Sequence, residues 1–238
     1  MTNLENVQAI YPQQITPWYQ VKLDNETLEY LWNAIEAGEK ESICYKKNLA
    51  GNISTSFSIK DIDNFFTNNV LLRLANTYEQ THGFSSYDAR NPTEGIDKNG
   101  NPLIPNGCML SLQSFWANYQ YKHEFNPAHS HGGAYSFVIW MKIPYDSNKQ
   151  KEQEFLQGTS SDAVEAGNFY FEYTDMFGRI VNTQYPMSKE MEGTMLFFPA
   201  KLRHGVRPFY GCDEKRVSIS GNLSFVFKYY DLLDIVSY

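Results

Sequence analysis

The sequence predicts a mainly β protein in which N-terminal helices pack on one face of a β-sandwich or small barrel. Two early segments carry apolar residues at helical spacing, whereas the chain after Cys108 is a succession of short β-rich runs. The 17 tyrosines and 16 phenylalanines also favour strands. We expect a single domain over residues 1–238, with helices and a loop region in 1–107 and the β core in 108–238.

Both expected helices have one apolar and one polar face, as helices laid on a sheet do. Asp24 or Asn25 can cap the first helix, and Gly38 is expected to close it. The second helix is expected from Asp61 to about His82. The apolar positions are Leu28, Leu31, Trp32 and Ile35 in the first helix, and Ile62, Phe65, Phe66, Val70, Leu71, Leu74 and Tyr78 in the second.

The β-rich part of the chain is divided by turn-forming and polar stretches. The segment 85–107 contains Asn-Pro and Asn-Gly pairs, which predict a loop or an early hairpin. The segment 146–166 is polar and without pattern, and we interpret it as a mobile excursion. Strands are expected near residues 109–121, 129–143, 167–174, 194–198, 204–209 and 216–228.

Charge and cysteine content exclude several classes of protein. The net charge of −7, from 20 basic and 27 acidic residues, argues against a protein that binds a phosphate backbone. The three cysteines form no CxxC pair, which argues against a zinc knuckle or a disulfide framework. No signal-peptide pattern and no membrane-length apolar run is present. We therefore expect a cytoplasmic protein that binds neither nucleic acid nor membrane.

The stretch FNPAHSHGGAY, residues 125–135, is the first candidate for a site. His129 and His131 stand two residues apart, just ahead of an apolar run. In a strand, residues i and i+2 project from the same face, so both imidazoles could point at one metal ion. The alternative is that they are two polar residues in a turn after Pro127.

Two later segments can complete this site. His204 follows an apolar run and a short turn, so it is expected to open a strand at the mouth of a barrel, although a lone surface histidine is the alternative. From Arg216 to Phe225 polar and apolar residues alternate, which is also typical of an edge strand facing water. A guanidinium with a hydroxyl neighbour, Ser218, is well suited to hold a carboxylate.

The series His129-x-His131, His204 and Arg216-x-Ser218 resembles the iron(II)- and 2-oxoglutarate-dependent oxygenases over about half of the chain. The resemblance implies a double-stranded β-helix, a jelly-roll or cupin-like barrel supported by the N-terminal helices. It also implies that the three histidines hold Fe(II) and that Arg216 with Ser218 grips 2-oxoglutarate. The segments NPAHSHGGAYS and FFPAKLRHGV are also similar to small oxygenases of marine bacteriophages. This similarity implies that the protein acts in the cytoplasm of the host cell.

His131 departs from the family pattern, in which Asp or Glu stands at this position. Three histidines could bind the metal and leave a more positive centre, or His129 and His204 could bind it with water. A carboxylate of Glu172 or Asp175 could also enter the site. We favour three histidine ligands, because strand periodicity puts His131 on the correct face. The other two histidines of the chain are not expected to be ligands.

The implied activity is that of a hydroxylase. With Fe(II), 2-oxoglutarate and O₂, such an enzyme hydroxylates an unactivated C–H bond and releases succinate and CO₂. Resemblance to prolyl-hydroxylase-type oxygenases makes a peptide or amino-acid side chain the expected substrate, and nucleobases and small metabolites remain open. The substrate, the regiochemistry and the oligomeric state are not determined by the sequence.

Two other classes of protein share parts of this pattern. A cupin with a three-histidine metal site would need no 2-oxoglutarate, but the glutamate expected soon after His-x-His is missing from residues 132–142, and Arg216-x-Ser218 would have no role. A jelly-roll binding or virion protein without catalysis would carry these histidines incidentally.

Overall fold

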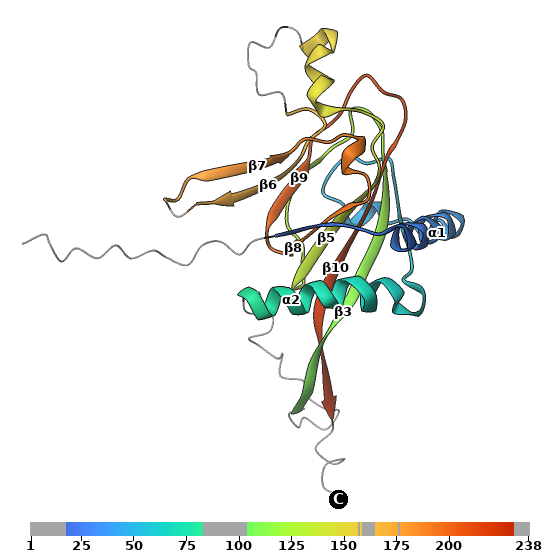
Figure 1. Ribbon diagram of the computed structural model, residues 1–238, viewed down its shortest axis with the longest axis vertical. Helices are drawn as coiled ribbons and strands as arrows, with labels where there is room; N and C mark the ends of the chain where they lie inside the picture. The colour runs from blue at the N-terminus through green and yellow to red at the C-terminus, as the bar shows by residue number, and fades with distance from the viewer. Residues whose placement is uncertain (1–17, 83–103, 157, 159–164, 176, 231–238) are drawn as a thin grey trace, which may run out of the picture.

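The computed structural model describes residues 18–82, 104–156, 158, 165–175 and 177–230. Two antiparallel sheets face each other, one of six strands in the order β1-β8-β5-β10-β3-β2 and one of four in the order β4-β9-β6-β7 (Figure 1). The predicted fold class, a mainly β double-stranded β-helix with supporting helices, is confirmed. The strands are β1 Tyr19–Lys22, β2 Thr55–Ser58, β3 Ile104–Gln120, β4 Asn126–His129, β5 Tyr135–Lys142, β6 Phe169–Thr174, β7 Ile180–Tyr185, β8 Thr194–Pro199, β9 Arg203–Val206 and β10 Arg216–Tyr230.

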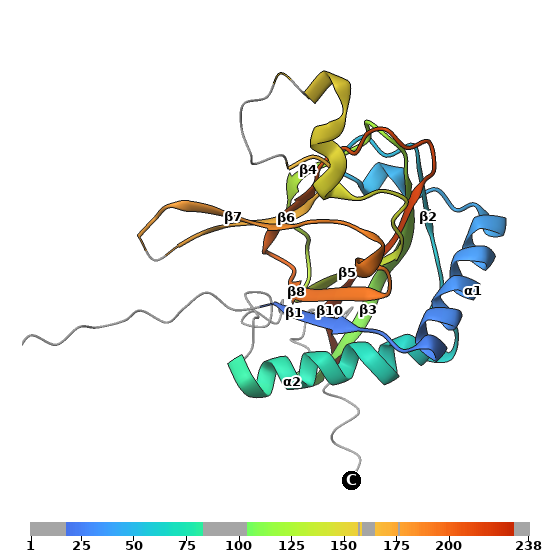
Figure 2. The same cartoon turned by 45° about the horizontal axis from the view of Figure 1, so that its top comes forward.

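Helices cover the outer face of the six-stranded sheet, on the side away from β6, β7 and β9 (Figure 2). Leu31 and Ile35 of the first helix are 0% and 1% exposed, and burial of each stabilises the fold by about 1.5–3 kcal/mol. Tyr78 of the second helix packs on Tyr135 of β5 with ring centroids 5.3 Å apart. The helical segments are α1 Asn25–Glu41, η2 Lys46–Asn48, η3 Ile62–Asn64, η4 Thr67–Leu71, α2 Leu72–His82, η6 Ser147–Glu152, η7 Glu154–Leu156 and η8 Lys189–Met191.

The first helix begins as predicted and ends later than predicted. The Asp24 carboxylate accepts from the Thr27 N–H at 2.8 Å, which caps the N-terminus. Gly38 does not close the helix, which continues to Glu41, and Ser42 in the left-handed region forms the C-cap. Gly38 has a packing role instead, because the helix crosses β2 closely at this position.

The second helix also departs from its prediction at the start. Asp61 accepts from the N–H groups of Phe66 and Thr67, both at 2.8 Å. Asp63 and Asn64, which lie between Asp61 and Phe66, have positive φ, so the first turn is not regular. A π-helical turn then leads into α2, and regular α-helix runs only from Leu72 to His82.

The expected single strand over residues 129–143 is wrong, because two strands in different sheets occupy this region. β4 ends at His129 in the four-stranded sheet, and β5 begins at Tyr135 in the six-stranded sheet. The chain crosses between the sheets through Gly133, which has a φ of +91°. A Cβ at this glycine would stand 2.6 Å from the Leu223 carbonyl oxygen, so the crossover needs glycine here.

Two segments interpreted as loops are partly ordered. Residues 147–156 form two 3-10 helices rather than a mobile excursion, since Ser147 and Gln150 are buried. The side-chain Oε1 of Gln150 accepts from the Tyr210 N–H at 2.8 Å, which connects this segment to the chain ahead of β10. Most of the stretch 85–107 lies outside the described residues, but β3 already begins at Ile104. In the described chain, helices long and apolar enough to cross a membrane are absent.

The close contact at Gly38 predicts that a methyl group there destabilises the protein. In Gly38→Ala the new Cβ would meet the Ser58 carbonyl oxygen at 2.7 Å and the Ile59 Cγ2 at 2.6 Å. The clash costs about 1–3 kcal/mol and exceeds the gain in helix propensity of about 1 kcal/mol. Urea unfolding should show a lower free energy of unfolding for Gly38→Ala. The control Glu36→Ala, on the exposed face, should change it by less than about 0.5 kcal/mol.

Candidate metal centre and 2-oxoglutarate site

Three histidines converge between the two sheets. His129 at the end of β4 pairs directly with His204 of β9, so their side chains lie on the same face of the four-stranded sheet. His131 lies in the crossover after β4, where its N–H donates to the Ala200 carbonyl at 2.8 Å. One ligand nitrogen from each ring lies within 4.8 Å of the others. The structure therefore brings together the three predicted ligands, but His131 arrives through the crossover rather than by strand periodicity.

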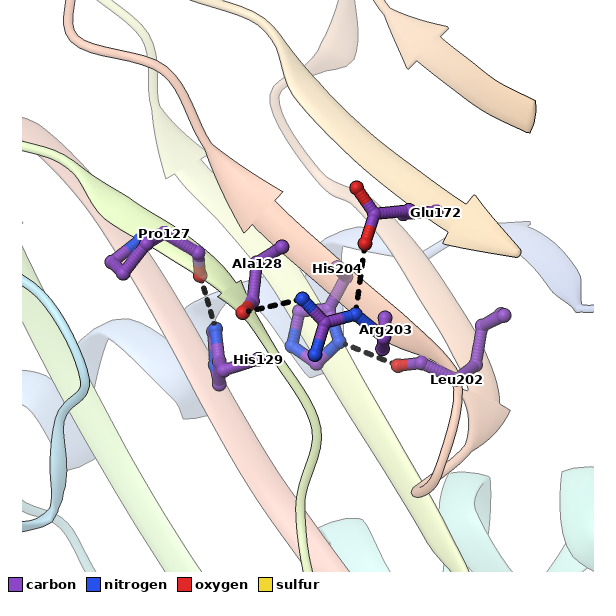
Figure 3. A network of polar contacts seen from close by, with 7 residues as sticks. All are labelled: Pro127, Ala128, His129, Glu172, Leu202, Arg203 and His204. Atoms are coloured by element: carbon purple, nitrogen blue, oxygen red, sulfur yellow. Dashed lines mark hydrogen bonds and ion pairs between the residues drawn. The ribbon is translucent and has the colours of Figure 1, made fainter. Parts of the chain in front are cut away.

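Backbone carbonyls set the tautomers of two of these rings (Figure 3). His129 Nδ1 lies 2.8 Å from the Pro127 carbonyl oxygen, and His204 Nδ1 lies 2.9 Å from that of Leu202. A carbonyl can only accept, so each Nδ1 carries the proton and each Nε2 keeps its lone pair, which in His129 accepts a long contact of 3.4 Å from the Asn126 side-chain amide. This is the usual outer contact of a metal-binding histidine.

Burial keeps the three imidazoles neutral. Burial and the charge of His129 lower the pKa of His131 to about 4. Burial holds the pKa of His204 well below its ordinary value, and it also lowers the pKa of His129. Neutral imidazoles are the form that binds a metal, so the donor set fits a transition metal such as iron(II).

The carboxylates considered as replacements for His131 lie elsewhere. Glu172 of β6 accepts from Arg203 Nε at 2.8 Å, and its neighbour Phe171 is the residue paired with His204 (Figure 3). Successive residues of a strand face opposite sides, so Glu172 points away from the histidines. Asp175 binds Arg179 in the turn between β6 and β7. Among the described residues, the cluster able to hold a metal consists of the three histidines.

Arg216 and Ser218 face the same cavity from the six-stranded sheet. Arg216 is 2% exposed, and β10 lies between β3 and β5, so the interpretation of this segment as an edge strand facing water is wrong. The Arg216 guanidinium donates to the Tyr145 hydroxyl at 2.8 Å and to the side-chain Oε1 of Gln120, while its Nε has no partner in the described chain.

The charge of Arg216 is not balanced by the side chains around it. Burial raises the pKa of Tyr145, whose hydroxyl donates to the Gly167 carbonyl at 2.7 Å, so this partner is neutral. Gln120 is neutral as well, and no Asp or Glu of the described chain lines the cavity. A buried, uncompensated guanidinium costs several kcal/mol. The site is therefore suited to an anionic ligand that reaches Arg216.

The cavity itself has about 520 Å³ of space free of protein atoms, its open mouth included. Sequence reasoning missed Gln120 and Tyr145, and it left Trp116 undecided between mouth and core. The alternation of Trp116, Asn118 and Gln120 along β3 could have indicated the inward face. Tyr145 follows β5 without a pattern. The residues that line the cavity are Leu49, Ile53, Trp116, Asn118, Gln120, Asn126, His129, His131, Phe137, Val138, Trp140, Phe169, His204, Val206, Arg216, Ser218 and Ser220.

The double-stranded β-helix, the three converging histidines and the buried arginine together define the candidate site of a metal-dependent oxygenase. Residues 114–222 match the family described as putative 2OG-Fe(II) oxygenase, and this segment contains the histidines as well as Arg216 and Ser218. The predicted resemblance to the 2OG-Fe(II) oxygenases is thereby confirmed over this segment, which is a little under half of the chain.

Other comparisons describe more distant similarity. No curated protein sequence matches the chain. An oxidoreductase of the 2OG-Fe(II) oxygenase family from Burkholderia pseudomallei is 17% identical, with 48% of this chain and 43% of that chain covered and a TM-score of 0.33. The chain thus spans less than half of that protein. A Pseudomonas putida prolyl-4-hydroxylase is 11% identical, with 90% and 93% covered and a TM-score of 0.45. HygX from Streptomyces hygroscopicus, with nickel, 2-oxoglutarate and hygromycin B bound, is 10% identical, with 88% and 83% covered and a TM-score of 0.44.

The geometry predicts which histidines metal affinity depends on. His131→Ala and His204→Ala should each raise the Kd for Fe(II) at least about 100-fold, because each removes one of three converging nitrogens. Anaerobic calorimetric titration measures this Kd. The matched control is His123→Asn, since His123 lies outside the cluster and its φ of 70° suits asparagine.

The same titration tests the carboxylate alternative. Glu172→Gln should leave the Kd for Fe(II) within about threefold of the unchanged protein, because Glu172 binds Arg203 on the other face of β6. A large loss of affinity in Glu172→Gln, together with retention in His131→Ala, would show that a carboxylate rather than His131 is the third ligand.

Proposed function

We propose that this chain is an Fe(II)- and 2-oxoglutarate-dependent dioxygenase, a single domain over residues 1–238, which hydroxylates a peptide or amino-acid-type substrate. The observation that carries this proposal is the buried Arg216 guanidinium, which has no carboxylate partner in the described chain and shares a cavity with three converging histidines. The pairing of β1 with β8 and of β2 with β3 joins residues before and after 107, which supports a single domain.

His129, His131 and His204 would hold the metal through nitrogens that are neutral and free of protons. The carbonyls of Pro127 and Leu202 would keep two of the rings in the required tautomer. When bound, iron(II) with 2-oxoglutarate and O₂ supplies the oxidative decarboxylation, in which one oxygen atom enters succinate and the other becomes the hydroxyl group of the product.

Arg216 would bind the far carboxylate of 2-oxoglutarate, with the Ser218 hydroxyl beside it on the same face of β10. Tyr145 and Gln120 orient the guanidinium, since each accepts one of its N–H groups. Trp140 and Phe169, with ring centroids 5.5 Å apart, form the apolar wall that excludes water from this region. These residues would hold the cosubstrate in one orientation beside the histidines.

A cupin without 2-oxoglutarate is less well supported. Such a protein would have to keep the Arg216 charge buried without a ligand to compensate it. The family match over residues 114–222 also names 2-oxoglutarate oxygenases. A non-catalytic binding protein would leave both the arginine and the three neutral histidines without a role.

The role of Arg216 predicts a selective loss of cosubstrate affinity. Arg216→Lys keeps the charge but loses the guanidinium fork, and it should raise the Kd for 2-oxoglutarate about tenfold or more. Arg216→Ala should raise it about 100-fold, because a charge-assisted hydrogen bond is lost. Calorimetric titration of the metal-loaded protein measures both values, and the Kd for the metal should change by less than about threefold.

Tyr145→Phe is the matched smaller change. It removes one hydrogen bond to Arg216 and should raise the Kd for 2-oxoglutarate about 3–10-fold. If Arg216→Lys and Arg216→Ala both bind 2-oxoglutarate as tightly as the unchanged protein, the assignment of Arg216 is wrong.

Conversion of 2-oxoglutarate to succinate in the presence of O₂ tests the proposed activity directly. Slow conversion without substrate is expected, and a candidate peptide or amino acid that is hydroxylated should accelerate it. His204→Ala should abolish conversion. Anaerobic addition of Fe(II) and 2-oxoglutarate should produce a weak visible band that neither produces alone. Iron binding without this band would favour the cupin, and no iron binding would favour a non-catalytic protein.

A further inference from the structure

Trp116 presents a hydrogen-bond donor that the described chain does not use. Its side chain lines the cavity, is 3% exposed, and has its ring centroid 5.8 Å from that of His131. The indole Nε1 is buried and has no hydrogen-bond partner among the described residues. By contrast, Trp18 Nε1 donates to the Tyr185 hydroxyl at 2.6 Å. An unpaired buried donor costs about 1–3 kcal/mol, so this N–H is suited to an acceptor supplied by a ligand.

The charges of the assembled site indicate the sign of that ligand. Three neutral histidines leave the two positive charges of the metal uncompensated, and Arg216 adds a third. The 2-oxoglutarate dianion balances only two of these charges. In the usual family pattern a carboxylate ligand would balance the last one, but His131 stands in its place. With no Asp or Glu of the described chain lining the cavity, one positive charge remains for a further anion.

Positively charged residues also lie next to Trp116 through its stacking partner. Tyr45 stacks on Trp116, with centroids 4.6 Å apart and planes 14° apart, and it is followed by the exposed Lys46 and Lys47. The acidic Glu124 is not part of the cavity lining, and its two carboxylate oxygens accept the backbone N–H groups of Ser54 and Tyr121, both at 2.9 Å. The lysines can therefore attract an anion toward the cavity.

We propose that the substrate carries a carboxylate group, which accepts a hydrogen bond from Trp116 Nε1 beside the three histidines. This inference rests on the proposed function, because the excess charge exists only when metal and 2-oxoglutarate are bound. Asn118, two residues along β3, also faces the cavity, and its amide can turn to donate to the same group. Free amino acids, peptide C-termini and other small carboxylic acids belong to this class of substrate.

The indole N–H signals of the full chain test this proposal. The protein is labelled with ¹⁵N-tryptophan, loaded with Zn(II) in place of Fe(II), and saturated with 2-oxoglutarate. Acetate and its neutral analogue acetamide are then titrated separately, with the Trp116 resonance assigned from Trp116→Phe. Acetate should move this resonance downfield with a Kd about tenfold or more below that of acetamide, because a charged acceptor binds more strongly. The Trp18 resonance should not move, because its N–H is already paired.

A Trp116 resonance that stays in place with acetate, or that responds equally to acetamide, overturns the proposal. The charge argument is tested by His131→Asp, which restores an anionic ligand and should weaken acetate binding about tenfold or more. An unchanged acetate Kd in His131→Asp shows that the excess charge is not the cause of binding.

Failure of the inference and failure of the proposed function give different results. If 2-oxoglutarate binds through Arg216 but acetate does not move the Trp116 resonance, the substrate inference is wrong and the oxygenase proposal is unaffected. If 2-oxoglutarate does not bind, the oxygenase proposal fails, and with it the charge balance on which the substrate inference rests.

Discussion

The two-residue alternation of β10, in the middle of the six-stranded sheet, constrains both the core and the site. Val217 and Ile219 face the helices, whereas Arg216, Ser218 and Ser220 face the cavity. A slip of one residue against β3 or β5 would exchange these faces and bury the guanidinium under the helices. The same register therefore specifies the apolar core and the polar site, so neither can change without the other.

Much of the fold could be predicted because its signals are local. The N-cap at Asp24, the helical stripes and the alternation of β10 each lie within one short segment. The predictions failed where a distant part of the chain decides the outcome. Gly38 reads as a helix terminus, but β2 packs against it and the helix continues. Strand β7, Ile180–Tyr185, was missed because it is a short edge strand with polar residues on it.

The candidate site was predictable in its residues rather than in its geometry. His129 and His204 are cross-strand partners, as two strand-end histidines of a barrel can be. His131 was assigned for the wrong reason, since the chain leaves the sheet after His129 and the contact with Ala200 positions the second imidazole. Gln120 and Tyr145 lie 96 and 71 residues from Arg216 along the chain, so short-range patterns could not identify them as its partners.

The cavity also contains several buried polar atoms that have no hydrogen-bond partner in the described chain. Nine buried side-chain atoms in the described chain have no hydrogen-bond partner, and four of them belong to residues lining this cavity: Trp116, Asn118, Asn126 and Arg216. Each unpaired group costs stability, and the aromatic and aliphatic core on the other side of the six-stranded sheet can offset that cost. Ligands that form hydrogen bonds with these atoms bind the folded chain and not the unfolded one, so they stabilise the folded protein. The unpaired polar groups of the cavity therefore lower the stability of the free protein, and the same groups are available to bind ligands.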